Sequence, residues 1–221
     1  MARQLRLRLG RDGQSPTFDA FVRGPSNAGA VAAVEAWPGW LGGCLAVVGP
    51  KGVGKSHLAR AWAASVDALV VDAQAPDIQA AAGRPVLLED ADRGFSTEGL
   101  FHLINVAARD GGGLLLTART RPASWPTALP DLRSRLNAFP VVEIEPPDDT
   151  VLEGVLRRFF EARNIRPPAA VYPYLLARMP RSIPDAAAIV ERLDEAGDEG
   201  FRPVTRALAR EILEAQGTLG L

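Results

Sequence analysis

Short apolar runs recur along the first 145 residues, each bounded by glycine, proline or polar residues. Continuous apolar runs are typical of parallel strands that are covered on both faces. Between them, apolar residues recur every three or four positions, as in helices with one buried face. The expected strands are residues 45–48, 68–72, 86–88, 114–117 and 141–144, and the expected helices are residues 28–37, 58–63, 76–83, 96–109 and 129–136. This alternation predicts an α/β fold with a parallel five-stranded sheet flanked by helices.

Pro146-Pro147 interrupts the alternation, and the pattern beyond it is helical throughout. One helix is expected to start at Asp148, and the others are expected at about residues 169–178, 183–196 and 205–216. Glycine, serine and proline between residues 10 and 16 indicate a linker. The sequence therefore predicts an N-terminal segment with linker, an α/β core and a small all-helical lid domain. Their bounds are 1–16, 17–146 and 147–221.

The composition is that of a folded domain with mixed charges. Hydrophobic residues make up 47% of the 221 positions, and the formal net charge is −1. A charge of this size argues against nucleic-acid binding driven by overall charge. The single cysteine, Cys44, cannot form an internal disulfide, and the N-terminus lacks the apolar stretch of a signal peptide. Because no stretch is long and apolar enough to span a membrane, a cytoplasmic location is expected.

The strongest motif follows the expected strand at 45–48. Residues 49–56 match the P-loop pattern in full, between a strand and a helix. The glycines let backbone N–H groups turn toward a polyphosphate, and the helix N-terminus adds partial positive charge. Lys55 is expected to reach the β- and γ-phosphates, and Ser56 to bind Mg²⁺. The predicted nucleotide-binding residues here are Gly49, Pro50, Lys51, Gly52, Val53, Gly54, Lys55 and Ser56. A chance glycine-rich turn is the alternative, but both lysines of this arginine-rich chain lie in this loop.

Two carboxylates follow the expected strand at 86–88. An apolar strand that ends in acidic residues, here Glu89 and Asp90, is the arrangement in which P-loop proteins hold Mg²⁺ and polarise the attacking water. The predicted metal ligands are Ser56, Glu89 and Asp90, and Asp90 is also a catalytic candidate. The residues alone do not say which of the two carboxylates touches the metal.

Further polar residues lie near the expected site, after the strands at 86–88 and 114–117. Asp92 is expected to be solvated. Thr117, Arg119 and Arg121 end the expected strand at 114–117, and a polar side chain at that tip is placed to sense a γ-phosphate.

Residues 4–9 have two interpretations. Leu5, Leu7 and Leu9 alternate with polar or charged residues, which is the period of an edge strand. A short apolar segment that begins with a glutamine, Gln4, and precedes a linker is also typical of a peptide that docks on a partner. The pattern alone leaves both interpretations open.

Several motifs together resemble one family. A P-loop core followed by a helical lid is the AAA+ architecture, and here it is similar to the DnaA clade and, more narrowly, to the Hda family of short DnaA homologues that regulate bacterial replication initiation. FDAFVRGPSN at 18–27 resembles the DnaA segment that lies against the adenine, and GPKGVGKSHL at 49–58 resembles the DnaA P-loop. The other similar segments are LPDLRSRL at 129–136 (Box VII), MPRS at 179–182 (sensor II) and VTRALAREIL at 204–213 (the Hda C-terminus).

The resemblance assigns roles that the pattern leaves open. It implies that Arg135 is an arginine finger that acts in trans on the γ-phosphate of a neighbouring subunit. It also implies that Arg181 contacts the phosphates of its own chain from the lid. The nucleotide-binding residues implied outside the P-loop are Phe21, Val22, Asn27, His57 and Arg181.

The resemblance also implies partners. QLRLRL at 4–9 is similar to the family's sliding-clamp motif, Q-L-x-L-P-L, with Arg8 in place of proline. The side chains that would fill the clamp pocket are Gln4, Leu5, Leu7 and Leu9. An ADP-bound protein docked on the DNA polymerase III clamp would stimulate ATP hydrolysis by DnaA. No sequence-specific DNA binding is implied, because no helix-turn-helix follows the lid, and self-association through AAA+ contacts or the clamp peptide stays open.

Two other functions fit parts of the sequence. Intact Lys55, Ser56 and Asp90 are compatible with an autonomous AAA+ ATPase of the helicase-loader type, whereas the resemblance implies a regulator with weak or no hydrolysis of its own. The resemblance departs at Glu89, where DnaA relatives usually have aspartate, and the longer side chain would change the Mg²⁺ geometry and so hydrolysis by this chain. A small-molecule P-loop kinase would leave Arg135 and residues 4–9 without a purpose. The sequence does not decide whether ADP or ATP is the resident nucleotide.

Overall fold

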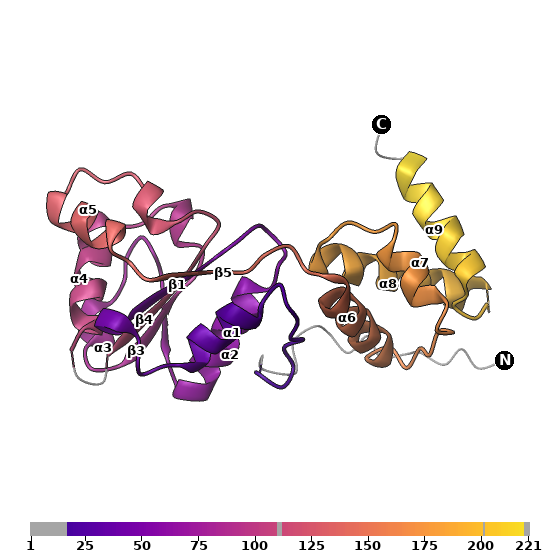
Figure 1. Cartoon of the computed structure of the whole chain (residues 1–221), viewed down its shortest axis with the longest axis horizontal. Coiled ribbons are helices and arrows are strands. Elements are labelled where there is room, and N and C mark those ends of the chain that lie inside the picture. The colour runs from indigo at the N-terminus through magenta and orange to yellow at the C-terminus, as the bar shows by residue number, and fades with distance from the viewer. Residues whose placement is uncertain (1–16, 110–111, 201, 219–221) are drawn as a thin grey trace.

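The computed structural model describes residues 17–109, 112–200 and 202–218. A lobe built on a β-sheet forms one end of the molecule, and a lobe of helices forms the other (Figure 1). The predicted clamp-binding segment at 4–9 lies outside the described residues. Within those ranges, no helix is both long and apolar enough to cross a membrane.

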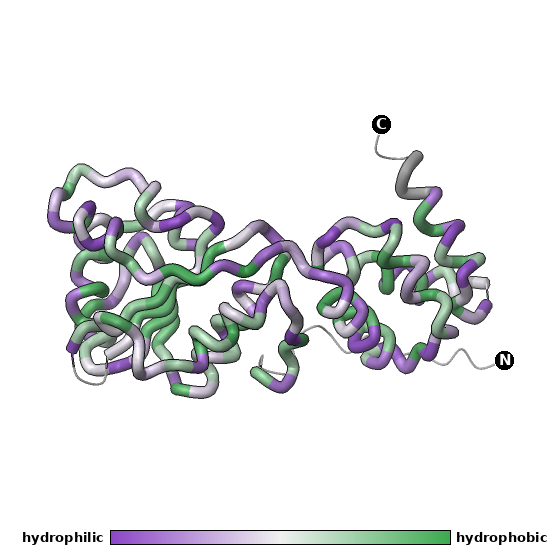
Figure 2. Tube along the Cα trace, viewed as in Figure 1, coloured by the Kyte–Doolittle hydropathy of each residue, from purple (hydrophilic) through white to green (hydrophobic). Residues whose placement is uncertain are grey.

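The sheet has five parallel strands in the order β2-β3-β4-β1-β5. The strands are β1 (Cys44–Val48), β2 (Leu69–Val71), β3 (Pro85–Leu88), β4 (Gly113–Ala118) and β5 (Val141–Glu143). All residues of β1 and β4 are buried, which explains why these strands are continuous apolar runs in the sequence. The hydrophobic colour of the central strands shows the same feature (Figure 2). The predicted parallel five-stranded sheet with flanking helices is confirmed.

Helices cover both faces of this sheet, because successive strand residues point to opposite sides. Leu45 and Val47 of β1 pack with α1 and α2, whereas Cys44 and Ala46 pack with α3, α4 and α5. The helices are α1 (Ala28–Glu35), α2 (Lys55–Val66), α3 (Ile78–Ala81), α4 (Thr97–Ala107) and α5 (Pro130–Asn137), with 3-10 turns η1 (Leu41–Gly43), η2 (Ala91–Arg93) and η3 (Pro122–Ser124). The carboxyl ends of β1, β3 and β4 therefore meet at one edge of the layered lobe.

The second lobe has a hydrophobic core of its own. Its helices are α6 (Asp149–Glu161), α7 (Val171–Leu176), α8 (Ile183–Gly200) and α9 (Arg206–Thr218). Leu152, Phe160, Leu175 and Ile189 are fully buried at the centre of that core. The all-helical pattern expected after Pro146-Pro147 is present, and α8 is longer than the expected 183–196.

Backbone and side-chain hydrogen bonds join the two lobes. The Asp148 carboxylate accepts the Ser26 N–H (2.8 Å) and the Val151 N–H (3.0 Å), and the Asp148 N–H donates to the Ser26 hydroxyl (3.3 Å). Arg158 of α6 donates to the carbonyl oxygen of Asp19 (2.6 Å). Asp148 thus caps α6 and also fixes that helix to the segment before α1.

Asp148→Ala should lower the free energy of unfolding by about 2 kcal/mol, because it removes a helix cap and a second bond to Ser26. Urea denaturation measures this loss. Ser96→Ala removes a cap from α4, where the Ser96 hydroxyl accepts only the Gly99 N–H among its described contacts, and should cost about 1 kcal/mol. An Asp148→Ala loss no larger than that of Ser96→Ala would contradict the linking role.

The same residue should make stability depend on pH. Burial would raise the pKa of Asp148, but the N–H groups of Ser26 and Val151 and the Ser26 hydroxyl outweigh it and hold the pKa below its usual range. With the folded pKa below the unfolded value of about 4, the stabilisation is present above that value and is lost as the pH falls through the folded pKa. Asp148→Ala should therefore flatten the acid limb of the stability curve.

Candidate nucleotide-binding site

The P-loop connects the end of β1 to the start of α2. A side chain at Gly49 (φ 152°) would lie 2.3 Å from the Ile144 carbonyl oxygen, so β1 can leave the sheet there only with glycine. Gly54 has a left-handed φ of 102° immediately before α2. The N-terminus of α2 therefore opens directly onto the loop, which is the geometry that binds phosphate groups.

Lys55 lies under this loop. Its ammonium group donates to the carbonyl oxygens of Gly49 and Pro50, both at 2.8 Å, and the residue is buried. Burial lowers the pKa of Lys55, and among nearby charges Asp90 raises it while Arg119 lowers it. The P-loop lysine therefore shares its electrostatic environment with the ends of β3 and β4.

The two carboxylates after β3 have different partners. Glu89 accepts a hydrogen bond from Arg60 of α2 at 2.7 Å and is mostly buried, whereas Asp90 pairs with Arg93 at 3.2 Å. Asp90 has a left-handed φ of 50°, and its N–H donates to the Thr117 hydroxyl at 2.9 Å. The predicted metal ligands thus lie beside the P-loop helix, but their carboxylates are held by separate arginines.

Two expectations for the neighbouring residues need correction. Asp92 is not simply solvated, because its carboxylate accepts the N–H groups of Arg119 (2.9 Å) and Thr120 (3.1 Å). Thr117 is fully buried, and its hydroxyl holds the Asp90 backbone, so it supports the carboxylate turn and does not face a ligand. Arg121 pairs with Glu143 at 3.3 Å, which leaves Arg119 as the candidate phosphate sensor at this strand tip.

The segment before α1 supplies the residues expected near the base. The Phe21 and His57 rings pack edge to face, with centroids 5.6 Å apart. Asn27 is buried, and its side chain bonds to the Val22 carbonyl oxygen (2.9 Å) and the Gly24 N–H (3.0 Å). Asn27 therefore shapes this turn, while Phe21 is buried against the His57 ring of α2.

The helical lobe contacts the P-loop directly. The Ile183 N–H, at the start of α8, donates to the Gly52 carbonyl oxygen at 3.0 Å. A side chain at Gly52 would lie 2.9 Å from both Ser182 and Pro184. Arg181, two residues before α8, pairs with Asp149 at 2.6 Å. Arg181 thus lies two residues before the Ile183 contact with the P-loop, and its side chain pairs with α6.

Arg135 lies far from this site. It is exposed in the last turn of α5, with its guanidinium 5.2 Å from the centre of the Phe101 ring. Burial raises the pKa of the Cys44 thiol to about 12, and the charge of Arg135 partly offsets this rise. Cys44 begins β1 and the P-loop follows its other end, roughly 13 Å away. Figure 1 likewise shows α5 at the end of the molecule opposite the helical lobe.

The neighbouring Arg133 has a different environment. Its guanidinium donates to the carbonyl oxygens of Ala123 (3.1 Å) and Trp125 (2.8 Å), so it fixes the loop around η3. Of the two arginines in this motif, Arg135 is therefore the one with donors available to another molecule.

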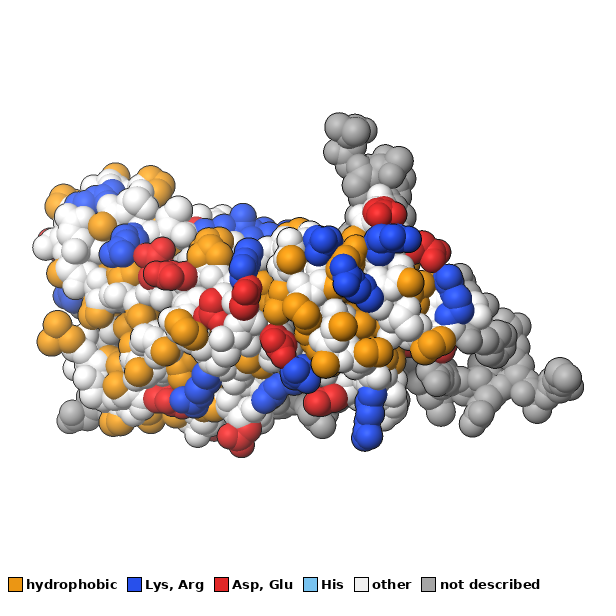
Figure 3. Space-filling model, turned by 45° about the vertical axis from the view of Figure 1, so that its right-hand side comes forward, with side chains coloured by type: hydrophobic (Ala, Val, Ile, Leu, Met, Phe, Trp, Pro, Cys, Tyr) orange, Lys and Arg blue, Asp and Glu red, His pale blue; other side chains and the backbone are white. Residues whose placement is uncertain are grey.

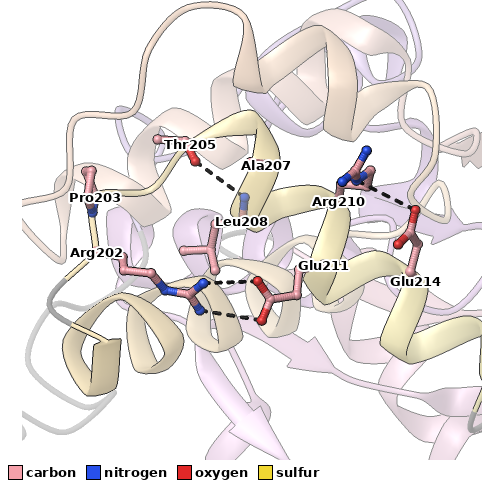
Figure 4. Close-up of a pocket in the computed structure, with 8 residues that line it drawn as sticks. All are labelled: Arg202, Pro203, Thr205, Ala207, Leu208, Arg210, Glu211 and Glu214. Carbon is pink, nitrogen blue, oxygen red and sulfur yellow. Dashed lines mark hydrogen bonds and ion pairs between the residues drawn. The ribbon is translucent and has the colours of Figure 1, made fainter.

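A separate pocket lies in the helical lobe, lined by the segment at 202–205 and by α9. Its charged side chains pair with one another: Arg202 with Glu211 at 3.1 Å and Arg210 with Glu214 at 3.8 Å (Figure 4). Thr205 caps α9 at its rim by accepting the Leu208 N–H at 3.3 Å. Because these charges are mutually neutralised, the P-loop remains the stronger candidate site. Acidic and basic side chains are also interspersed on the face seen in Figure 3.

The sequence is similar to those of known proteins of replication initiation. The chain is 28% identical to the chromosomal replication initiator protein DnaA of Caulobacter sp. (strain K31) over 233 residues, which cover 89% of this chain and 48% of that protein. The sequence is homologous to the AAA+ region of DnaA. The chain spans about half the length of the curated relatives it matches. No protein-family model matches it.

Solved structures establish the fold. Domain III of the Thermotoga maritima replication initiation protein DnaA superposes with a TM-score of 0.74 at 20% identity, covering 90% of this chain and 96% of that one. The replication initiator DnaA bound to AMPPCP and single-stranded DNA gives a TM-score of 0.65 at 21% identity, covering 84% and 66%. The chain therefore has the AAA+ P-loop NTPase fold.

Proposed function

We propose that this chain is a nucleotide-binding AAA+ regulator of DNA replication initiation, of the Hda type, and that it acts in the cytoplasm. The observation that carries the proposal is a complete P-loop in an AAA+ fold whose sequence is homologous to DnaA. A DnaA of the same fold has been solved with AMPPCP, which supports a nucleotide in the corresponding site here.

ADP or ATP would bind with its phosphates on residues 49–56 and its base beside Phe21 and His57. Magnesium suits this site, because one Glu89 carboxylate oxygen is buried with no hydrogen-bond partner among the described residues. When bound, Mg²⁺ would neutralise phosphate charge. Among the described residues, no group of three or more His, Cys, Asp or Glu side chains could hold a metal ion by itself, so Ser56, one carboxylate and phosphate oxygens would form the ligand set.

Arg135 would act on a neighbouring subunit, DnaA. Its exposure and the place of α5 at the end of the molecule opposite the helical lobe support a role in trans (Figure 1). A guanidinium that enters the DnaA site would neutralise charge that develops on the γ-phosphate. Arg181, in the lid segment against Gly52, would report the nucleotide state of its own chain. Contact between the Arg135 face of one copy and the nucleotide site of another would also permit a homodimer or a larger homo-oligomer.

Removing residues 1–9 should abolish binding to the DNA polymerase III sliding clamp and leave nucleotide affinity unchanged, because Gln4, Leu5, Leu7 and Leu9 would supply the clamp contacts. Surface plasmon resonance on immobilised clamp measures the first, and nucleotide titration the second. Arg8→Pro, which restores the family residue, should strengthen clamp binding. Unchanged clamp affinity after the deletion would contradict the docking role and favour the interpretation of residues 4–9 as an edge strand.

The proposal as a whole is tested on the purified protein. The protein is denatured, any released nucleotide is identified by chromatography, and the clamp is then titrated into a native sample. Released ADP together with clamp binding is the expected result. The proposal would be contradicted by a nucleotide-free protein that binds neither added ADP nor the clamp.

The alternative is an autonomous ATPase of the helicase-loader type. The combination of Lys55, Ser56 and an unpartnered Glu89 oxygen favours it, because these groups could support hydrolysis within one chain. Phosphate release by the isolated protein separates the two functions: sustained turnover without DnaA or clamp selects the ATPase.

A further inference from the structure

Arg60 and Glu89 form an ion pair beside the proposed nucleotide site. The Arg60 Nε donates to the Glu89 Oε2 at 2.7 Å, and the exposed fractions of the two side chains are 60% and 19%. Glu89 is thus largely withdrawn from solvent, whereas Arg60 reaches it from the surface of α2. An arginine that meets a buried carboxylate through one oxygen can fix its orientation without enclosing it.

The second oxygen of Glu89 has no partner in the described part of the chain, a property shared by Oδ1 of Asp92, whose other oxygen is held by the backbone of Arg119 and Thr120. Glu89 Oε1 is buried and has no hydrogen-bond partner among the described residues. An ionised carboxylate has acceptor sites on both oxygens, and leaving one buried oxygen unsatisfied is costly. This oxygen is therefore suited to a ligand that brings positive charge or a donor.

The position of Arg60 indicates which ligand. Arg60 lies four residues after Ser56, so both side chains project from the same face of α2. The ion pair consequently brings the Glu89 carboxylate to the helix face that carries the P-loop hydroxyl. Asp90 differs in burial: its side chain is 42% exposed, Oδ2 pairs with Arg93 at 3.2 Å, and it has no buried oxygen without a partner among the described residues.

We propose that Arg60 is a positioning residue that fixes Glu89 Oε2, so that Oε1 joins the magnesium shell of the bound nucleotide. The inference rests on the proposed nucleotide site and assigns the metal carboxylate to Glu89 and not to Asp90. Glutamate has one more rotatable bond than aspartate, and the contact with Arg60 removes that freedom. Partners of this kind commonly tune metal affinity by 10–100-fold.

The test measures how much magnesium strengthens nucleotide binding. The affinity of full-length protein for the fluorescent analogue MANT-ADP is measured at saturating Mg²⁺ and in EDTA, and the ratio of the two is compared among variants. Wild type should bind more tightly with Mg²⁺. Arg60→Ala should reduce this ratio about tenfold with unchanged affinity in EDTA, and Arg60→Lys should restore part of it.

Two further variants sharpen the result. Glu89→Gln should reduce the ratio as Arg60→Ala does, and the double variant should be no worse than either, because the two residues act as one unit. Arg84→Ala is the matched control: it removes another exposed arginine, which pairs with Asp67 at 3.7 Å, and should leave the ratio unchanged.

The other outcomes overturn the inference in recognisable ways. A larger magnesium effect in Arg60→Ala would mean that Arg60 competes with the metal for Glu89. Equal losses of affinity with Mg²⁺ and in EDTA would mean a purely structural role, and unchanged affinities under both conditions would mean no role. If wild type binds MANT-ADP under neither condition, the nucleotide-binding function itself fails, which is a distinct result.

Discussion

Replacing Arg135 with alanine is expected to abolish stimulation of DnaA ATP hydrolysis while leaving the fold and nucleotide affinity intact. Its guanidinium lies over the Phe101 ring at an exposed position, so its removal disturbs little packing. An arginine finger supplied by a neighbouring subunit is worth about 10³–10⁵ in rate, because it neutralises charge that forms only during transfer. The assay follows phosphate release from ATP-loaded DnaA with the clamp on DNA, and a loss of about a thousandfold in the stimulated component is expected.

Controls separate this role from a general effect of charge. Arg84→Ala removes an exposed arginine from the same lobe and should leave stimulation unchanged. Arg135→Lys keeps the charge but loses the planar fork of donors, so most of the stimulation should still be lost. Full stimulation by Arg135→Ala would exclude it as the finger. A fall in melting temperature alongside the loss would instead indicate that the contact with Phe101 is structural.

The fold could be predicted because its signals are local. Central strands β1 and β4 are buried on both faces, so they stand out as apolar runs. Helix ends were less predictable, and α8 shows why. The helix expected at 183–196 stops before Gly197, yet α8 continues to Gly200, and a side chain at 197 would lie 3.1 Å from the Arg202 carbonyl oxygen. That glycine serves the close approach of the returning chain, which no local pattern encodes.

The site was predicted only as far as its motifs extend. The P-loop and the carboxylate pair are each an uninterrupted run of residues. The residues that hydrogen-bond to the site lie far away in sequence. Asp92 bonds to Arg119 and Thr120, which lie 27 and 28 positions away, and Asp148 bonds to Ser26 across 122 positions. The pairing of Arg60 with Glu89 likewise depends on how α2 packs beside β3. An arginine on a helix carries no signal of the carboxylate it will meet, so these residues needed the structure.

Lys55→Ala should abolish binding of ADP and ATP, and it should cancel the rise in melting temperature that nucleotide produces. Lys55 is buried and already donates to two loop carbonyl oxygens, so its ammonium group is held where phosphates would bind. A nucleotide at a hundred times its Kd stabilises the folded state by ~2.7 kcal/mol. For a chain of this size, that corresponds to roughly 5–11 °C in Tm. Isothermal titration calorimetry and thermal denaturation, with and without ADP, measure both effects.

The chain offers a matched control for this substitution. Lys51 is its other lysine, lies in the same loop and is exposed, so Lys51→Ala changes the same charge without removing a buried donor. It should retain most of the affinity and most of the Tm rise. Equal losses in both variants would mean that the loop attracts nucleotide only through its overall charge. Wild-type affinity in Lys55→Ala would count against the P-loop as the nucleotide site.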